Sequence, residues 1–233
     1  MLVAAAVCPC PPLLVPEVAA GAAPELDAAR DACADAVGVL AASRPDLLVV
    51  VGPADESGTF RHGAVGTFAG FGVDVSVRLG AGEPGAQSLP ASLAVGAWLL
   101  ERAGWADAPV QGHAVAERLE PGPCAEAGEE LASRAGRVAL LVMGDGSACR
   151  TLKAPGYLDE RATAFDAVAA AALGSADIAA LKGLDDRLAH ELKAAGRAPW
   201  QVLAGAAADA GLAGRLLYED APYGVGYFVG VWS

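Results

Sequence analysis

Two uninterrupted apolar runs constrain the fold of this chain more than any other feature of its sequence. Residues 46–51 contain Leu-Leu-Val-Val-Val, and residues 137–143 contain a second run, Val-Ala-Leu-Leu-Val-Met. A strand that is apolar along its whole length is typical of the middle of a parallel sheet, where helices cover both faces. The sequence therefore predicts an α/β fold, in which helices connect the strands of a mostly parallel sheet.

Segments of strand length and segments of helical period alternate along the chain. We expect strands at residues 2–7, 46–51, 73–79, 111–116 and 137–143, and helices at residues 26–42, 89–103, 125–135, 159–172, 178–194 and 200–210. Residues 215–219 and 225–232 are expected to form two final strands. The Ala-Pro-Tyr-Gly turn between them predicts a C-terminal hairpin at the edge of the sheet.

The length and composition of the chain indicate one large domain. Its 233 residues contain no obvious linker, so we expect a single α/β domain over residues 1–233, with its central sheet flanked by helices. Hydrophobic residues make up 54% of the chain and aromatic residues only 6%. This composition predicts a core of small aliphatic side chains packed in layers.

The charge of the chain disfavours two classes of partner. A formal net charge of −12 argues against nucleic acid and anionic membrane surfaces, because both are bound through clustered Lys and Arg. The first eight residues are apolar but lack a basic region and are broken by Pro9, so we expect neither a signal peptide nor a spanning helix, and a cytoplasmic protein. The partners left open are a small molecule, for which an anionic compound is one option, and further copies of the chain.

Three turns that follow predicted strands are the expected places for chemistry, because ligands of open α/β sheets sit outside the carboxyl ends of the strands. The first turn, residues 8–12, is Cys-Pro-Cys-Pro-Pro. The second, residues 52–55, is Gly-Pro-Ala-Asp, and the third, residues 144–150, is Gly-Asp-Gly-Ser-Ala-Cys-Arg. Five cysteines in the whole chain show no spacing typical of a disulfide framework or a zinc knuckle, so we expect reduced thiols.

In these three turns the chain resembles the catalytic B-subunit family of class III extradiol ring-cleavage dioxygenases. The family's turns are of the types Pro-His-Pro-Pro, Ser-Pro-His and Gly-Asp-x-Ser-His, where the first two histidines bind non-haem iron and the third is thought to act in acid–base catalysis. This chain has Cys10, Ala54 and Ala148 at the three histidine positions. The resemblance implies the family's α/β fold with a degenerate metal site.

The resemblance extends to residues 154–161 and 223–227, so it covers most of the chain. It implies that Glu219, or its neighbour Asp220, stands for the family's carboxylate ligand. Iron in such a site needs imidazoles and a carboxylate, and alanine cannot ligate a metal. We therefore expect no cofactor, and we favour a non-catalytic or repurposed protein that binds a small, anionic molecule.

One alternative is a metal-dependent oxidoreductase with an altered ligand set. Fe(II) or Zn would then be held by Cys10, His62 and Glu219, with His62 and His113 as the candidate catalytic groups. His62 follows the second turn by a few residues, and His113 follows a short predicted strand.

Two further alternatives stay open. Cys8 and Cys10 project to the same face of an extended segment, so a thiol site could combine them with Cys149 and an oxygen from Asp55 or Glu219. The simpler explanation is that these thiols are small buried hydrophobes. The chain could also be a scaffold that associates through its apolar C-terminal hairpin.

For the binding function, the third turn offers the most contacts. The N–H groups of its Gly-Asp-Gly-Ser segment, with basic side chains nearby, can cradle a carboxylate or a phosphate. The competing explanation is that its Asp and Ser only cap the turn through the backbone. The predicted ligand-binding residues are Cys10, Ala54, Asp55, Asp145, Gly146, Ser147, Cys149, Arg150 and Lys153.

Overall fold

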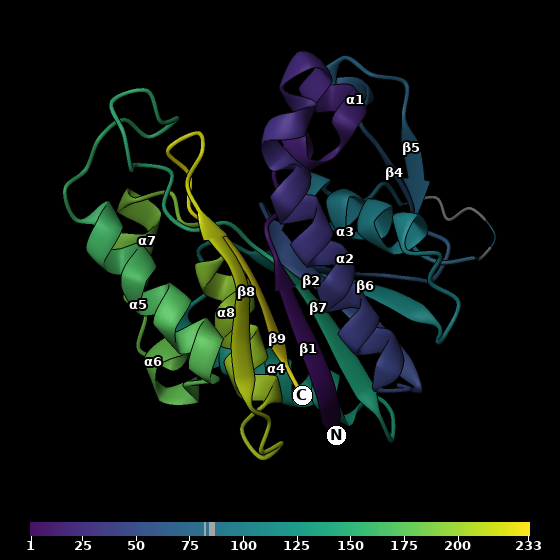
Figure 1. The fold of residues 1–233 in the computed structure, drawn as a ribbon. Helices are drawn as coiled ribbons and strands as arrows, with labels where there is room; N and C mark the ends of the chain where they lie inside the picture. Colours follow the sequence, from purple (N-terminus) through teal and green to yellow (C-terminus); the bar gives the residue numbers. More distant parts are fainter. Residues whose placement is uncertain (82, 84–86) are drawn as a thin grey trace.

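Seven strands form a central sheet whose four middle strands are parallel (Figure 1). The computed structural model describes residues 1–81, 83 and 87–233. The strand order is β3-β6-β2-β7-β1-β9-β8, and β6, β2, β7 and β1 run parallel to one another. The strands of this sheet are β1 (Leu2–Cys8), β2 (Leu47–Ala54), β3 (Gly58–Phe60), β6 (Val110–Ala116), β7 (Val138–Met143), β8 (Gly214–Asp220) and β9 (Tyr227–Trp232).

Helices cover both faces of the sheet, which gives three layers (Figure 1). One face packs against α2 and α3, and the other against α4 to α8. The helices are α1 (Pro16–Ala19), α2 (Asp27–Ala42), α3 (Ala91–Arg102), α4 (Pro121–Ser133), α5 (Ala162–Ser175), α6 (Ile178–Lys182), α7 (Asp186–Glu191) and α8 (Arg197–Ala206), with short 3-10 turns η1 (Pro12–Leu14), η2 (Ala20–Leu26) and η3 (Ala69–Phe71). The expected α/β domain with helices on a mostly parallel sheet is confirmed.

The apolar runs form the middle of the sheet, as their composition predicts. Every residue of β7 is buried, and so are the first seven residues of β2. Alternate side chains enter different cores: Leu48 and Val50 pack towards α2 and α3, while Val49 and Val51 pack towards the α4–α8 layer. An uninterrupted apolar strand is needed here because neither face of the sheet meets water.

The C-terminal hairpin lies at the edge of the sheet, as expected. Strand β9 pairs antiparallel with β1 on one side and with β8 on the other. All six residues of β9 are buried. The apolar strand β9 is therefore part of the sheet interior, and β8 is the edge strand on this side of the sheet.

Two predicted elements differ from the structure. Residues 178–194 contain the two short helices α6 and α7 instead of one. Helix α6, capped at its start by Asp177, ends at Gly183, and Asp185 then caps a new helix by accepting a hydrogen bond from the backbone N–H of Leu188 (2.7 Å). The strand predicted at residues 73–79 is shortened to β5 (Ser76–Arg78), which pairs with β4 (Val65–Thr67) in a separate two-stranded sheet.

The carboxyl ends of β1, β2, β6 and β7 meet at one end of the sheet, which we call the carboxyl edge. The connection between β8 and β9 lies at the same edge, because β9 runs antiparallel to β1. Among the residues that the structure describes, no helix combines the length and the apolar composition needed to cross a membrane.

Candidate functional site

The first and third predicted turns lie against each other at the carboxyl edge. The backbone N–H of Gly144 donates to the carbonyl oxygen of Cys8 over 2.9 Å, which extends the pairing of β1 with β7 by one residue. The backbone N–H of Cys10 then donates to Oδ1 of Asp145 over 2.8 Å. The Asp145 side chain therefore caps the Cys-Pro-Cys turn, which supports the structural explanation for this residue.

The environment of Asp145 raises the pKa of its carboxyl group. Burial raises the pKa of the Asp145 carboxyl group to about 7, while hydrogen bonds from the backbone and side chain of Cys10 oppose the shift. Burial penalises the charged form because the protein solvates it less well than water does. The carboxyl group is thus partly protonated near neutral pH.

We expect a pH-dependent stability that disappears in the variant Asp145→Asn. In the unfolded chain an aspartate has a pKa near 4, so between about pH 4 and 7 the folded state binds more protons and becomes less stable as the pH rises. Asparagine keeps an oxygen for the N–H of Cys10 and does not titrate. Urea unfolding at about pH 5 and pH 8 should show the variant gaining stability relative to the parent at the higher pH. Asp55→Asn, at an exposed position, serves as control. If the free energy of unfolding of Asp145→Asn changed with pH as that of the parent does, the raised pKa of Asp145 would be contradicted.

The thiols of the predicted site lie in two different cores. Cys8 and Cys10 belong to the core under α2 and α3, whereas Cys149 belongs to the core on the opposite face, where its Sγ donates to the carbonyl oxygen of Leu192 over 3.4 Å. The hypothetical thiol site that joins Cys149 to Cys8 and Cys10 is therefore not formed. Cys149 instead packs against the end of α7.

None of these thiols is activated as a thiolate. A hydrogen bond with Cys33, together with burial, raises the pKa of Cys8 well above its ordinary value. Burial followed by the nearby charge of Asp145 does the same for Cys10. Burial also raises the pKa of Cys149. A thiol that stays protonated is neither a good nucleophile nor a metal ligand.

His62 does not lie at the carboxyl edge. Strand β3 runs antiparallel to β6, so the chain reverses after the second turn and carries His62 towards the start of β6. There its Nδ1 accepts a hydrogen bond from the backbone N–H of Val110 over 3.2 Å. Val110 is the first residue of β6, so His62 stands at the opposite end of the sheet from Cys10 and Asp145.

His113 lies in the middle of β6, paired with Val51 of β2 and Thr59 of β3. Its pKa is lowered by burial and, to a lesser extent, by the charge of Arg134. Its buried Nδ1 has no hydrogen-bond partner among the described residues. The side chain is a neutral imidazole beside α4, two residues before the strand reaches Val115 and the carboxyl edge.

The two alanines at the family's histidine positions make hydrogen bonds through their backbones, and neither side chain can ligate a metal. The carbonyl oxygen of Ala54, the last residue of β2, accepts from the backbone N–H of Glu117 over 3.1 Å. The N–H of Ala148 donates to Leu192 over 2.9 Å. Asp55, which follows Ala54, is exposed.

The alternative metal ligands do not come together. Cys10 lies under α2 and α3, His62 stands at the other end of the sheet, and Glu219 lies on the edge strand β8. Within the described part of the chain, no three His, Cys, Asp or Glu side chains form a group that could hold a metal ion. The residues predicted for Fe(II) or Zn therefore do not fit such an ion in this arrangement.

A buried carboxylate organises the third turn, and it is absent from the sequence-based prediction. Asp166 of α5 is fully buried. It accepts hydrogen bonds from the N–H of Ser147 to Oδ1 (2.7 Å), from the Ser147 hydroxyl to Oδ2 (2.8 Å) and from Nη1 of Arg150 to Oδ2 (3.0 Å). The predicted binding residue Ser147 is thus occupied by a contact within the protein.

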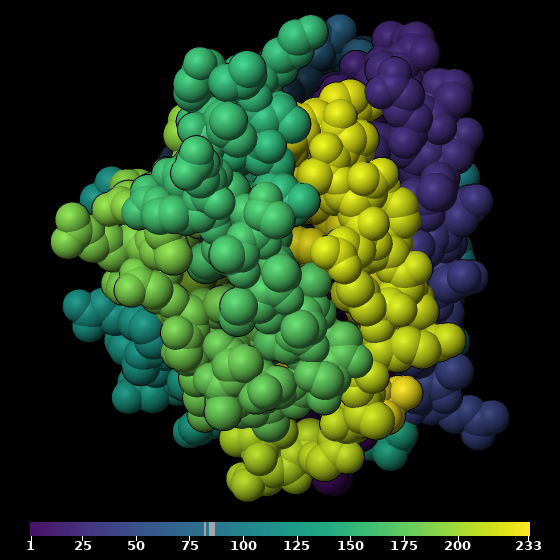
Figure 2. Space-filling model, turned by 60° about the vertical axis from the view of Figure 1, so that its left-hand side comes forward, coloured from purple at the N-terminus to yellow at the C-terminus, as the bar shows by residue number. Residues whose placement is uncertain are grey.

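The turn is also joined to the C-terminal hairpin. Gly146 donates its N–H to the carbonyl oxygen of Gly226 (2.7 Å), and Arg150 donates its N–H to that of Gly224 (3.0 Å). A side chain at Gly226 would place its Cβ 2.7 Å from Oδ2 of Asp166. The glycine is therefore required by this close approach. Figure 2 shows the resulting surface, where the green segment that includes α5 lies directly beside the yellow C-terminal hairpin.

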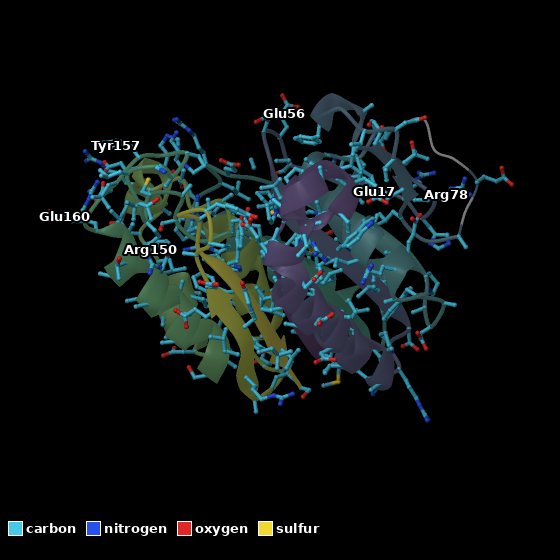
Figure 3. All side chains as sticks on the ribbon, turned by 45° about the horizontal axis from the view of Figure 1, so that its top comes forward. Glu17, Glu56, Arg78, Arg150, Tyr157 and Glu160 are labelled. Carbon is cyan, nitrogen blue, oxygen red and sulfur yellow. The ribbon has the colours of Figure 1, made fainter. Side chains whose placement is uncertain are left out.

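A polar pocket opens between the third turn and the hairpin. It has a volume of about 410 Å³ and is lined by Arg150, Thr151, Glu219, Asp220 and Ala221. Figure 3 shows Arg150 beside the end of the hairpin. The pocket brings together two residues that the sequence analysis selected separately, Arg150 and Glu219. Lys153, on the same loop, is exposed outside the pocket lining.

A larger cavity of about 510 Å³ lies elsewhere, between α3 and the small β4–β5 sheet. It is lined by Leu100, Trp105 and other residues beside the loop that precedes β6. None of the three predicted turns contributes to it. We therefore place the candidate site in the smaller pocket at the carboxyl edge, where ligands of open α/β sheets bind.

The fold and the pocket define this chain as a three-layer α/β protein with a polar pocket at the carboxyl edge of its sheet. A solved structure similar to it is that of uncharacterized protein JW3007 from Escherichia coli K12, with a TM-score of 0.58 and 15% sequence identity over 99% of both chains. At that identity the likeness concerns the fold alone. No family model matches the sequence, and no curated protein matches it.

Proposed function

We propose that this chain is a non-catalytic binding protein for a small molecule with an anionic group, and that the pocket beside Arg150 is its binding site. The observation that carries the proposal is the position of Arg150, whose guanidinium group is fixed by the fully buried Asp166 at the wall of the pocket. The three turns resemble those of the extradiol dioxygenase family, but alanine or cysteine stands at the positions of the family's histidines. This is consistent with a binding function that does not use the family's iron chemistry.

Arg150 has donors left for a ligand. One N–H group of its guanidinium engages Asp166 over 3.0 Å, and the side chain is 27% exposed. Guanidinium carries five N–H donors in a planar fork. A fork that is already oriented by a buried partner loses little conformational entropy when it binds a carboxylate or a phosphate through two parallel hydrogen bonds.

The test is a calorimetric titration with small carboxylates and phosphates, some of which also carry an amino group. We expect saturable binding and a raised melting temperature for at least one of them, since a ligand that prefers the folded state stabilises it. Arg150→Lys keeps the charge opposite Asp166 but removes the fork, and it should weaken binding by about tenfold or more.

Lys153→Gln is the matched control, because it removes a positive charge from the same loop but outside the pocket. It should leave the affinity within about twofold. Equal losses in the two variants would indicate general attraction of anions instead of a site at Arg150. Absence of binding by every compound would overturn the proposal.

A further inference from the structure

We infer that the ligand of this pocket also carries a primary ammonium group, which binds Glu219, so that the pocket accepts small amino acids in the broad sense of a carboxylate joined to an amine. The inference rests on the proposed binding function and identifies the class of ligand. It follows from the charges that line the pocket, which are of both signs and are not paired with one another.

The pocket disfavours a ligand that is only an anion. The positive charge of Arg150 faces the buried carboxylate of Asp166 on one side and the carboxylates of Glu219 and Asp220 across the pocket. The positive charge of one guanidinium group is therefore outnumbered by the negative charges of three carboxylates. A simple carboxylate gains the hydrogen bonds of Arg150 but is repelled by the remaining negative charge, whereas a zwitterion brings a compensating cation.

Glu219 is the carboxylate left available for that cation. Its backbone belongs to the β8–β9 pairing, but within the described part of the chain its side chain makes no hydrogen bond and no ion pair and is exposed at the pocket wall. Asp220 is different, because its Oδ1 accepts from the N–H of Ala221 (2.7 Å) and its Oδ2 from the hydroxyl of Tyr218 (3.5 Å). Glu219 therefore offers two free oxygens, and Asp220 adds charge beside it.

The chemistry of an ammonium group suits the remaining lining. A primary ammonium has three N–H donors and no acceptor, and the pocket wall supplies acceptors of two kinds, the carboxylate of Glu219 and the hydroxyl of Thr151. The two ends of the ligand are thus recognised by different elements: the third turn holds the carboxylate through Arg150, and the end of β8 holds the ammonium group. A volume of about 410 Å³ lies at the small end of the range for ligand pockets.

The experiment compares matched compounds by calorimetric titration at constant ionic strength. Acetate, propionate and butyrate carry only the anion, ethylamine and propylamine only the cation, and glycine, β-alanine and 4-aminobutyrate both. We expect the best amino acid to bind about tenfold or more tighter than the carboxylate of equal chain length, because it adds charged hydrogen bonds. In Glu219→Gln this advantage should fall to about twofold or less, with plain carboxylates bound no more weakly than by the parent.

Glu160→Gln is the control, since Glu160 is an exposed carboxylate on the neighbouring loop, outside the pocket lining (Figure 3). It should retain the full preference for the amino acid. Plain carboxylates that bind as tightly as amino acids, with both dependent on Arg150, would overturn this inference and leave the proposed function standing. If phosphates bind through Arg150 but no carboxylate of either kind does, only this inference fails. If neither carboxylates nor phosphates bind, both proposals fail, and amines that bind alone and independently of Arg150 would also overturn both.

Discussion

Gly128→Ala should lower the free energy of unfolding by about 3 kcal/mol or more, the upper end of the cost of overpacking a core. Gly128 lies on α4 where this helix crosses α8. A Cβ atom built there would stand 2.0 Å from the carbonyl oxygen of Val202 and 2.6 Å from the backbone nitrogen of Ala206. Backbone atoms cannot rotate away as a side chain can, so the two helices would have to separate.

Helix α8 also has a glycine where its backbone approaches that of α4. A Cβ atom at Gly205 of α8 would lie 2.1 Å from the carbonyl oxygen of Ala125. The two glycines therefore allow α4 and α8 to pack with their backbones in contact. Gly205→Ala should destabilise the protein by a similar amount, and the double variant by less than the sum, because one separation of the helices relieves both contacts.

Gly38→Ala is the matched control for these variants. Gly38 lies in the middle of α2, it is exposed, and no atom stands within 4 Å of a Cβ built on it. Alanine should stabilise this helix by roughly 0.5–1 kcal/mol, because glycine is the poorer helix former. Urea unfolding of all the variants measures the difference. A Gly128→Ala protein as stable as Gly38→Ala would show that α4 and α8 are farther apart than described.

The sheet was predictable because its sequence signal is local. An uninterrupted apolar run, as in β2 and β7, can be buried on both faces only in the middle of a sheet, and its position follows from the residues of the strand itself. The division of residues 178–194 into α6 and α7 was not predicted, since apolar residues continue across Gly183 with a helical period. The capping aspartate Asp185, two residues after Gly183, was the signal that could have revealed it.

The candidate site was only partly predictable because it depends on pairings between distant segments. Sequence distance placed His62 near the second turn, but the reversal of the chain at β3 moves it to the opposite end of the sheet. Cys149 lies within the third turn as expected, yet the direction of that turn sends its side chain into the core away from Cys10. Arg150 and Glu219 were selected for separate reasons, and only the hairpin brings both to one pocket.

Asp166→Ala should be the most damaging polar substitution of the site, with a loss of about 3–5 kcal/mol, because it leaves several hydrogen-bond donors without an acceptor and each buried one costs about 1–3 kcal/mol. The alanine would leave three donors without their acceptor: the N–H and the hydroxyl of Ser147, and Nη1 of Arg150. For a chain of this size the loss corresponds to a melting temperature lower by roughly 6–20 °C.

Variants that remove fewer of these contacts test whether the loss of stability comes from the hydrogen bonds of Asp166 with Ser147 and Arg150. Ser147→Ala removes one hydroxyl donor and should cost about 1 kcal/mol. Asp166→Asn keeps the shape but presents an amide N–H₂ group to donors, so its cost should lie between those of Ser147→Ala and Asp166→Ala. Asp35→Ala, on an exposed position of α2, should change the stability by no more than about 0.5 kcal/mol.

The order of these variants tests the role of Asp166 in the pocket as well as in the fold. Since Asp166 fixes the guanidinium of Arg150, Asp166→Asn should weaken carboxylate binding even at temperatures where the variant is fully folded. Ser147→Ala leaves the contact between Asp166 and Arg150 in place and should bind as the parent does. If Asp166→Asn were folded and bound carboxylates with unchanged affinity, the orientation of Arg150 would not depend on the buried carboxylate, and the argument for a prepared anion site would fail.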